Sequence, residues 1–389
     1  MKVVSIIGAR PQFIKCAPVS RELRALADEV LVHTGQHYDD AMSGVFFREL
    51  GIAAPDYQLG VGSGSHGRQT GEMLRRIEEV LEKEAPAAVL VYGDTNSTLA
   101  GALAAAKLHV PVVHVEAGLR SFNRRMPEEI NRVLTDQLSD LLLCPTATAV
   151  ENLRREGVTA GVHLVGDVMY DALLDSAERA DHTSTILERL GVEPHEYLLA
   201  TVHRADNTDR LPQLEAIMTA FQALVDSGRT IVFPVHPRTR KQLGRVSFKN
   251  HERLLLIDPV PYLDMVRLES MAQALVTDSG GIQKEAYWLG VPCITLREET
   301  EWVETVERGW NRLVGTHPDS IVNAVRTAGP GLAGEWPWKR GESSHTVARM
   351  IVQYRQGQGS PADVPEQDWL RSPRDSSHAV GLAVTDCAG

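Results

Sequence analysis

Short runs of branched apolar residues recur along the whole chain, and helical patterns separate them. The runs are rich in Val, Leu and Ile and do not alternate with polar residues. Strands buried on both faces have this composition, which is typical of parallel sheets covered by helices. The chain therefore predicts repeated β-α-β units. The runs lie at residues 3–7, 30–33, 87–92, 112–115, 141–144, 162–165, 197–202, 230–235, 254–257, 274–277, 293–296 and 312–314.

The length and the grouping of these runs predict two domains. A chain of 389 residues exceeds what one hydrophobic core usually serves. We expect two doubly wound, Rossmann-like parallel-sheet domains that face an interdomain cleft, with a boundary near residues 166–171. Residues 1–168 would form the first domain. Residues 169–356 would form the second, which would begin with a helix over residues 172–190 and whose last helix could cross back. Residues 357–389, rich in Gly, Ser, Pro and Asp, would form a mobile tail.

The composition argues against several classes of protein. The formal net charge of -11 disfavours binding to nucleic acid or a membrane surface through bulk charge. No run of about 18 apolar residues could span a membrane, and the apolar part of the N-terminus is too short for a signal peptide. The cysteines have neither disulfide nor zinc-site spacing, and a cytoplasmic protein is expected. They are Cys16, Cys144, Cys293 and Cys387.

Three carboxylates stand where a cleft of such a protein would be. Asp94 ends an apolar run in VLVYGDTNST, and Glu116 ends the next run in HVEAGLRSFNRRMPEEINR. Glu128 belongs to the Pro-Glu-Glu helix start that follows. Because ligands bind beyond the carboxyl ends of parallel strands, we expect these acids to meet. Paired carboxylates in a cleft indicate proton transfer.

The helix expected over residues 127–138 orients Glu128. Glu128 and Arg132 lie four residues apart on one side of this helix. A stripe of apolar residues lies on the opposite side, where it would face the core. We therefore expect Glu128 to face the cleft, although a surface ion pair with Arg132 gives the same pattern. The stripe consists of Ile130, Val133, Leu134 and Leu138.

The second-half motif TDSGGIQKEAYWLG predicts an anion site. Gly280 and Gly281 allow a sharp turn and a close approach of the backbone to a ligand. A helix starts directly after them, and its free N–H groups suit a diphosphate. Glu285, one turn in, could accept hydrogen bonds from ribose hydroxyls. The alternative is an ordinary strand-turn-helix in which Ser279 caps the helix.

Cations and histidines at other strand ends favour the same interpretation. Arg10 and Lys15 flank the start of the first helix in GARPQFIK, where a cation opposes the helix dipole. This placement makes sense if Arg10 points at a phosphate, although it could pair with an acid at the surface. His203 and His236 each follow an apolar run and precede an arginine, a repeated placement more typical of phosphate recognition than of structural histidines.

The segment GSGSHG at residues 62–67 matches the dinucleotide-binding pattern G-x-G-x-x-G. It lies in a polar loop outside any clear β-α-β unit, and the acids about 20 residues further on belong to a helix. We interpret it as a flexible loop that could act as a lid, not as a nicotinamide site, and place His66 in solvent.

In several motifs at once, the chain resembles the non-hydrolysing UDP-N-acetylglucosamine 2-epimerases. The resemblance implies a glycosyltransferase-B-like fold, usually in a homodimer, with UDP held mainly by the second domain. It implies reversible epimerisation at C2 of UDP-N-acetylglucosamine to UDP-N-acetylmannosamine without a metal or other cofactor. The motifs, in the same order, are GARPQFIK, TGQHYD, GDTNST, HVEAGLR, MPEEINR, TVHRADN, HPRTR, TDSGGIQKEA and TEWVET.

The resemblance also implies a role for each matching residue. A base removes the C2 proton as UDP leaves C1, and UDP adds back to the 2-acetamidoglucal after protonation of its other face. The implied acids and bases, whose pKa values should be raised in a dry site, are Asp94, Glu116 and Glu128. The residues implied to support charge at the reacting centre are Lys15, Arg132 and His203. Those implied to hold UDP are Arg10, Ser279, Gly280, Gly281 and Glu285, with His236 as a further candidate.

Departures from the family pattern leave the substrate open. The chain has QHYDD at residues 36–40 and Ala at position 205. Allosterically activated members have other residues at these positions, so we expect no activation by a second substrate molecule. Its TEWVET segment is shared with epimerases of UDP-2,3-diacetamido-glucuronate. The candidates for pairing with that sugar's carboxylate are Arg124, Arg125 and Arg204. A hydrolysing epimerase, a glycosyltransferase and a non-catalytic UDP-sugar-binding protein are also compatible with the sequence.

Overall fold

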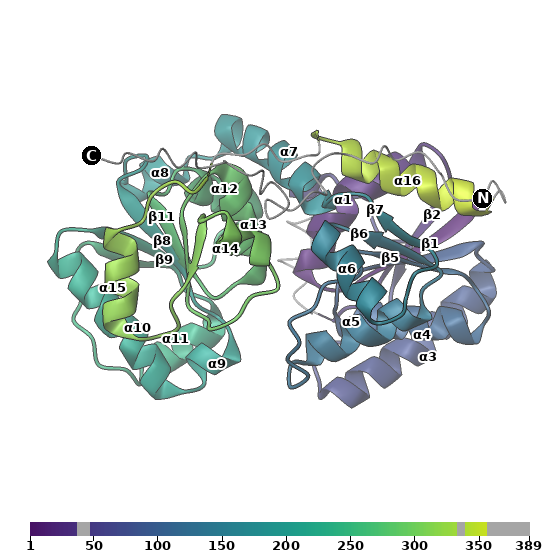
Figure 1. Cartoon of the computed structure of the whole chain (residues 1–389), viewed down its shortest axis with the longest axis horizontal. Helices are drawn as coiled ribbons and strands as arrows, with labels where there is room; N and C mark the ends of the chain where they lie inside the picture. Colours follow the sequence, from purple (N-terminus) through teal and green to yellow (C-terminus); the bar gives the residue numbers. More distant parts are fainter. Residues whose placement is uncertain (37–46, 333–338, 356–389) are drawn as a thin grey trace, which may run out of the picture.

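Two parallel β-sheets, each covered by helices, lie side by side in the protein (Figure 1). The structure is a computed structural model that describes residues 1–36, 47–332 and 339–355. Both sheets are parallel throughout, as the apolar runs predict, so the expected fold class is confirmed. The predictions made for residues 37–40, for Cys387 and for the tail at 357–389 lie outside the described residues.

The first sheet has the strand order β3-β2-β1-β4-β5-β6-β7. Its direction of winding reverses between β1 and β4, which makes the ends of these two strands a topological switch point. The central strand β4 is buried along its whole length. The strands are β1 (Lys2–Ile7), β2 (Asp28–His33), β3 (Tyr57–Gln58), β4 (Ala88–Tyr92), β5 (Val112–Val115), β6 (Leu141–Cys144) and β7 (Val162–Leu164).

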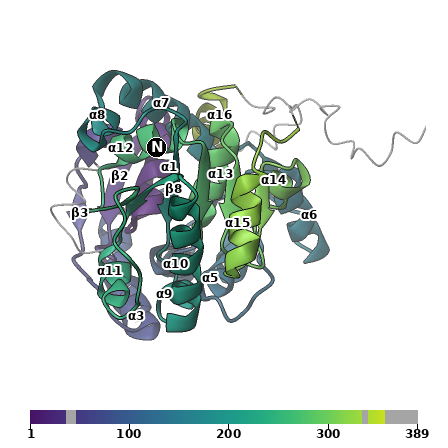
Figure 2. The ribbon, with the colours of Figure 1, turned by 90° about the vertical axis from the view of Figure 1, so that its left-hand side faces the viewer.

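The second sheet has the order β10-β9-β8-β11-β12-β13, and its switch point lies between β8 and β11. Helices α10 and α15 pack together on one of its faces (Figure 2). The strands are β8 (Tyr197–Thr201), β9 (Thr230–Pro234), β10 (Leu254–Ile257), β11 (Ala274–Thr277), β12 (Cys293–Thr295) and β13 (Asn311–Leu313).

The helices begin and end where local sequence signals favour it. Pro residues stand in the first turns of α1, α5, α10, α11 and α15, where no N–H is lost. The helices before the second sheet are α1 (Arg10–Arg24), α3 (His66–Glu84), α4 (Asn96–Lys107), α5 (Pro127–Leu138), α6 (Ala147–Arg155), α7 (Val168–Thr183) and α8 (Ile186–Leu190). The others are α9 (Ala205–Thr208), α10 (Leu211–Asp226), α11 (Pro237–Leu243), α12 (Tyr262–Ser270), α13 (Gly280–Leu289), α14 (Val303–Glu307), α15 (Pro318–Arg326) and α16 (Glu342–Arg355).

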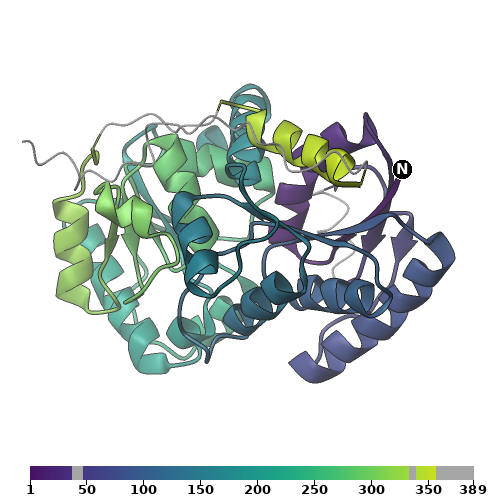
Figure 3. The ribbon, with the colours of Figure 1, turned by 45° about the vertical axis from the view of Figure 1, so that its right-hand side comes forward.

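The two ends of the described chain share one hydrophobic core. α16 follows the second sheet in sequence but packs on α1 and α7 (Figure 3). Its residues Val347 and Ile351 belong to the same buried cluster as Val3 of β1. α7, which connects the sheets, contacts both α1 and α12. This shared core fixes the helix α1, whose first turns carry candidate site residues.

Several details differ from the sequence-based expectations. β3 is a two-residue edge strand that the apolar runs do not reveal. The segment at 62–67 follows β3, and its last two residues already belong to α3. The single helix expected over residues 172–190 is two helices, because the chain leaves helical geometry at Ser184 and Thr185. Within the part of the chain that the structure describes, no helix is both long enough and apolar enough to cross a membrane.

Candidate active site

The residues that follow the two switch points lie toward each other across the domains. Arg10 follows β1 and Asp94 follows β4, while His203 follows β8 and Ser279 follows β11. Cross-domain contacts join the two rims. Tyr262 N donates to Glu49 Oε2 at 3.0 Å, and side chains of the second domain reach β5 and the chain after it. The candidate site therefore lies between the two sheets.

The start of α1 is held in a fixed conformation. The Gln12 side-chain oxygen accepts hydrogen bonds from Gly8 N at 2.8 Å and Ala9 N at 3.1 Å. This interaction fixes the turn that leads from β1 into α1 and orients Arg10. Lys15, on the same helix, is buried and its ammonium contacts the Glu116 carboxylate.

Glu116 is buried between cations from both domains. Lys15 contacts one carboxylate oxygen, and Lys284 Nζ of α13 lies 3.0 Å from the other. Burial would raise the pKa of Glu116, but the two lysines hold it well below its usual range. The expectation of a raised pKa is therefore wrong for this acid, because desolvation is outweighed by two opposite charges.

The backbone around Glu116 is unusual as well. Glu116 has φ +73°, a conformation that side-chain-bearing residues rarely adopt and that concentrates at functional sites. Gly93, before Asp94, has φ +63°, and a Cβ there would lie 3.1 Å from Glu116 Oε2 and 3.2 Å from Lys15 Nζ. The ends of β4 and β5 thus bring Asp94 and Glu116 next to each other.

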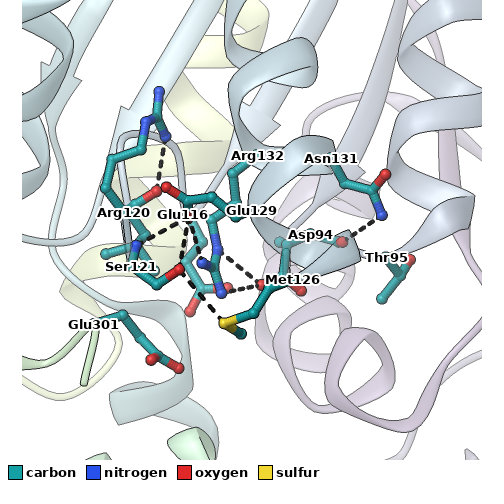
Figure 4. Close-up of polar contacts among 12 residues, drawn as sticks. Asp94, Thr95, Glu116, Arg120, Ser121, Met126, Glu129, Asn131, Arg132 and Glu301 are labelled. Atoms are coloured by element: carbon teal, nitrogen blue, oxygen red, sulfur yellow. Dashed lines mark hydrogen bonds and ion pairs between the residues drawn. The ribbon is translucent and has the colours of Figure 1, made fainter. Parts of the chain in front are cut away.

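Asp94 is paired with Arg132, which lies on α5 (Figure 4). The Arg132 guanidinium lies 2.7 Å from Asp94 Oδ2 and 2.8 Å from Glu129 Oε2. Asn131 donates to the Asp94 carbonyl oxygen at 2.9 Å and so fixes the backbone before α4. Asp94 keeps a partly exposed side chain, with 30% of its surface accessible, whereas Arg132 is buried. Asp94 can therefore meet a ligand that Arg132 helps to hold.

The inward face of α5 is polar, which corrects the sequence-based reading of this helix. Ile130 and Leu134 of the expected core stripe are both 45% exposed, so the prediction is wrong for these two residues, whereas Leu138 does pack against a buried cluster. Glu128 is exposed at the helix start. Glu129, the next residue, is buried and binds Ser121 N and Phe122 N as well as Arg132. The buried face, by contrast, consists of Glu129, Asn131, Arg132, Thr135 and Asp136.

Helix α13 presents its N-terminus after β11, as the glycine motif predicts. It begins at Gly280, and the Ser279 hydroxyl makes no capping hydrogen bond. Neither Gly280 nor Gly281 has a positive φ, so the expected sharp glycine turn is wrong. A Cβ at Gly280 would lie 2.4 Å from a side-chain oxygen of Glu301, which would have to shift, whereas a Cβ at Gly281 would meet no described atom nearer than 3.9 Å.

Glu285 lies in a buried acidic cluster beside Arg10. The Tyr262 hydroxyl donates to Glu285 Oε1 at 3.2 Å. Burial raises the pKa of Glu285, against the opposing charge of Arg10. Glu269 on α12 is also buried, and burial together with Glu285 raises its pKa well above the usual range. Glu269 Oε2 has no hydrogen-bond partner among the described residues.

The two histidines lie beside each other at the second switch point. The rings of His203 and His236 are 6.4 Å apart. His203 N and Arg204 N both donate to the buried carboxylate of Asp278, which fixes this loop. His236 is exposed at the start of α11. Burial lowers the pKa of His203, which favours a neutral imidazole that can hydrogen-bond a ligand.

Sequence reasoning missed residues that complete this arrangement. Lys284 stands beside Glu285 in the motif GGIQKEA, and this neighbouring position was the available signal. Asp167 binds Lys284 at 2.6 Å, and Trp302 of TEWVET lies under the same ammonium. His66 is exposed, as expected, and its Nδ1 lies 3.2 Å from Asn96 Nδ2. Arg124 and Arg125 are exposed in the loop before α5.

Other parts of the described chain do not offer a comparable site. A cavity of about 350 Å³ lies between α1 and α7, but its acid Asp175 is paired with Arg21 and Arg340. Among the described residues, no three His, Cys, Asp or Glu side chains are grouped to hold a metal ion.

Two parallel domains whose switch points meet across a cationic and acidic site define the glycosyltransferase-B-like class of fold. The sequence model of one family, described as UDP-N-acetylglucosamine 2-epimerase, matches residues 21–352. The chain therefore belongs to the UDP-N-acetylglucosamine 2-epimerase family.

Individual relatives agree with this assignment. A UDP-N-acetylglucosamine 2-epimerase homolog of Methanococcus maripaludis is 54% identical over 352 residues, which cover 89% of this chain and 98% of the relative. A UDP-2,3-diacetamido-2,3-dideoxy-D-glucuronate 2-epimerase of Pseudomonas aeruginosa is 52% identical, covering 84% and 92%. The crystal structure of Methanocaldococcus jannaschii UDP-GlcNAc 2-epimerase in complex with UDP-GlcNAc and UDP is similar with a TM-score of 0.82 and 43% identity, covering 90% and 99%.

Proposed function

We propose that the protein reversibly epimerises UDP-N-acetylglucosamine at C2 to UDP-N-acetylmannosamine, without net hydrolysis. The observation that carries this proposal is that Asp94 and Glu116 lie next to each other and that α13 contacts Glu116 through Lys284. The reaction requires both a group that carries the C2 proton and a site that binds the diphosphate. The family assignment supports the reaction type, and the jannaschii relative is named as bound to UDP-GlcNAc and UDP.

The reaction divides between the two domains. The C2–H bond breaks as its electron pair forms the C1=C2 double bond, and the C1–O bond breaks with its pair going to UDP. The proton passes to a carboxylate, with Asp94, Glu116 and Glu128 as candidates. Protonation of the other face of the 2-acetamidoglucal and return of UDP to C1 complete the cycle.

The second domain would hold UDP throughout this cycle. The free N–H groups at the start of α13, near Ser279, Gly280 and Gly281, suit the diphosphate. Arg10 supplies positive charge beside it, the His203 imidazole can form a hydrogen bond to it, and Glu285 is placed for the ribose. Arg132 and Lys15 would stabilise charge near the sugar, and His236 is a further candidate for contact with UDP.

A second substrate is favoured by one comparison. The chain is 52% identical to the Pseudomonas diacetamido-glucuronate epimerase but 43% identical to the jannaschii UDP-GlcNAc enzyme. The structure offers Arg204, whose side chain is 28% exposed and 3.9 Å from Glu301, as a cation for a uronate carboxylate. UDP-2,3-diacetamido-glucuronate is therefore the second candidate substrate.

Proton NMR in deuterated water tests both candidates. UDP-N-acetylglucosamine and UDP-2,3-diacetamido-glucuronate are incubated separately with the protein, and C2 epimerisation with deuterium incorporation is followed. Formation of the UDP-manno product supports the proposal for that sugar, and free N-acetylmannosamine indicates a hydrolysing enzyme instead. Both sugars unchanged, with their C2 protons intact, would refute the proposal. The homodimer and the absence of activation by substrate stay predictions, testable by light scattering and by rate against substrate concentration.

A further inference from the structure

Lys284 belongs to α13, the helix proposed to bind UDP. Its ammonium, however, contacts two carboxylates from the part of the chain that precedes the second sheet in sequence. Its Nζ lies 3.0 Å from Glu116 Oε1 and 2.6 Å from Asp167 Oδ2. The side chain is almost completely buried. The ammonium also lies 3.9 Å from the ring centroid of Trp302, within the range of a cation–π interaction.

We propose that Lys284 is a positioning residue that keeps the Glu116 carboxylate ionised and ties it to the nucleotide-binding helix. The inference rests on the proposed epimerisation and deepens it. Glu116 in this form is a base ready to accept the C2 proton. Lys284 acts through Glu116 and need not touch the sugar.

The charges around Glu116 support this role. Lys15 approaches from α1 and Lys284 from α13, while Asp167, at the start of α7, also contacts Lys284. These two ammoniums and two carboxylates balance in charge. A structural ion pair for Lys284 is already present with Asp167, so the second contact, to Glu116, adds a function beyond neutralising the lysine. Burial raises the pKa of Glu285, also on α13, and the charges of Arg10 and of these two lysines only partly oppose that rise.

The same arrangement allows Glu116 to be released when substrate binds. Asp167 and the Trp302 ring still hold the ammonium if Lys284 leaves Glu116 Oε1, which frees one carboxylate oxygen. When Glu116 takes the C2 proton, the cluster gains one positive charge. UDP that has left C1 carries one more negative charge than the diphosphate of the substrate. The positive charge gained by the cluster on proton transfer thus compensates the negative charge gained by UDP at the same helix, α13.

The test replaces the lysine without leaving a buried charge unpaired. Lys284→Met is combined with Asp167→Asn, which retains an oxygen that can accept the hydrogen bond from Met169 N. Lys284→Arg and Asp167→Asn alone keep the positive charge and serve as controls. Calorimetry with UDP checks that each variant is folded and binds nucleotide.

Two measurements report on Glu116. Carboxyl carbon-13 NMR, with the Glu116 signal assigned by its loss in Glu116→Gln, gives its titration directly. We expect the double variant to raise the pKa of Glu116 by about 1 to 3 relative to both controls, the size expected for losing one close opposite charge. The acid limb of the kcat profile should move by the same amount, so that kcat below it falls about tenfold for each pH unit by which the limb moves, while KM stays within about threefold.

The outcomes separate this inference from the proposed function. An unchanged Glu116 titration in the double variant would overturn the role of Lys284, whatever the activity. A displaced titration with an unmoved kcat profile would overturn it as well, because Glu116 would then not be the base. Absence of epimerisation by the wild-type protein counts against the proposed function, and the Glu116 titration remains measurable in that case.

Discussion

Trp302 provides a direct test of how the two domains are held together. It lies in the second domain's TEWVET segment and is only 5% exposed. Its buried cluster is otherwise formed by residues of β6, α6 and the chain after β5, such as Leu119, Leu142 and Leu153. Trp302→Ala should therefore weaken the interface between the domains and not only the second domain.

The size of the effect follows from the burial. A buried tryptophan removes about 150 to 250 Å² from water, worth roughly 4 to 6 kcal/mol at about 25 cal/mol per Å². Measured truncations of buried aromatic residues cost about 3 to 5 kcal/mol. For domains of about this size that loss lowers Tm by about 6 to 20 °C. The lost cation–π contact with Lys284 adds to it.

Differential scanning calorimetry measures the change, and small-angle scattering measures the separation of the domains. Trp310→Ala is the matched control, because Trp310 is half-buried and its indole N–H bonds Leu332 O within the second domain. We expect only Trp302→Ala to increase the radius of gyration. If Trp302→Ala left Tm within about 1 °C of the wild type, the stabilising role argued from its burial would be refuted.

Three further predictions follow from the site. Asp94→Asn and Glu116→Gln should abolish turnover yet leave UDP affinity within about tenfold by calorimetry; full activity in either would remove that residue from the proton pathway. Gly280→Ala should displace the side-chain carboxylate of Glu301 and lower the affinity for UDP relative to Gly281→Ala, whose Cβ meets no described protein atom nearer than 3.9 Å; equal affinities would contradict the packing argument. The pKa of Glu269 is raised in the folded protein, so its destabilising effect is absent below the unfolded value and grows as pH rises. Glu269→Gln should therefore raise Tm at pH 8 and not at pH 4. Its gain in the free energy of unfolding should grow by about 1.4 kcal/mol per pH unit between the unfolded and folded pKa values of Glu269; a pH-independent difference in Tm would refute this prediction.

The sheets could be predicted because buried parallel strands are continuous runs of branched apolar residues, which are visible in the sequence. Strands β5, β6, β10 and β11 lie at the residues where the apolar runs place them. β3 could not be found, since a two-residue edge strand has no periodicity. The break between α7 and α8 was hidden because both halves carry good helix formers.

The candidate site was harder to predict than the fold. Strand ends gave Asp94, Glu116 and Ser279, since topology brings these positions together. The orientation of α5 was wrong because its buried face is made of charged and amide side chains that satisfy one another. Apolar periodicity cannot reveal such a face. Lys284 was missed for a related reason: its partners come from sequence positions more than a hundred residues away.

The position of α16 has a consequence for biosynthesis. Residues 347–351 complete a hydrophobic core that begins at Val3, and they are made after the whole second sheet. Until they leave the ribosome, the apolar surfaces of α1 and α7 stay partly uncovered, so the domain begun first is finished last. A ribosome stalled anywhere before α16 would therefore carry a nascent chain with exposed apolar surface, to which chaperones bind.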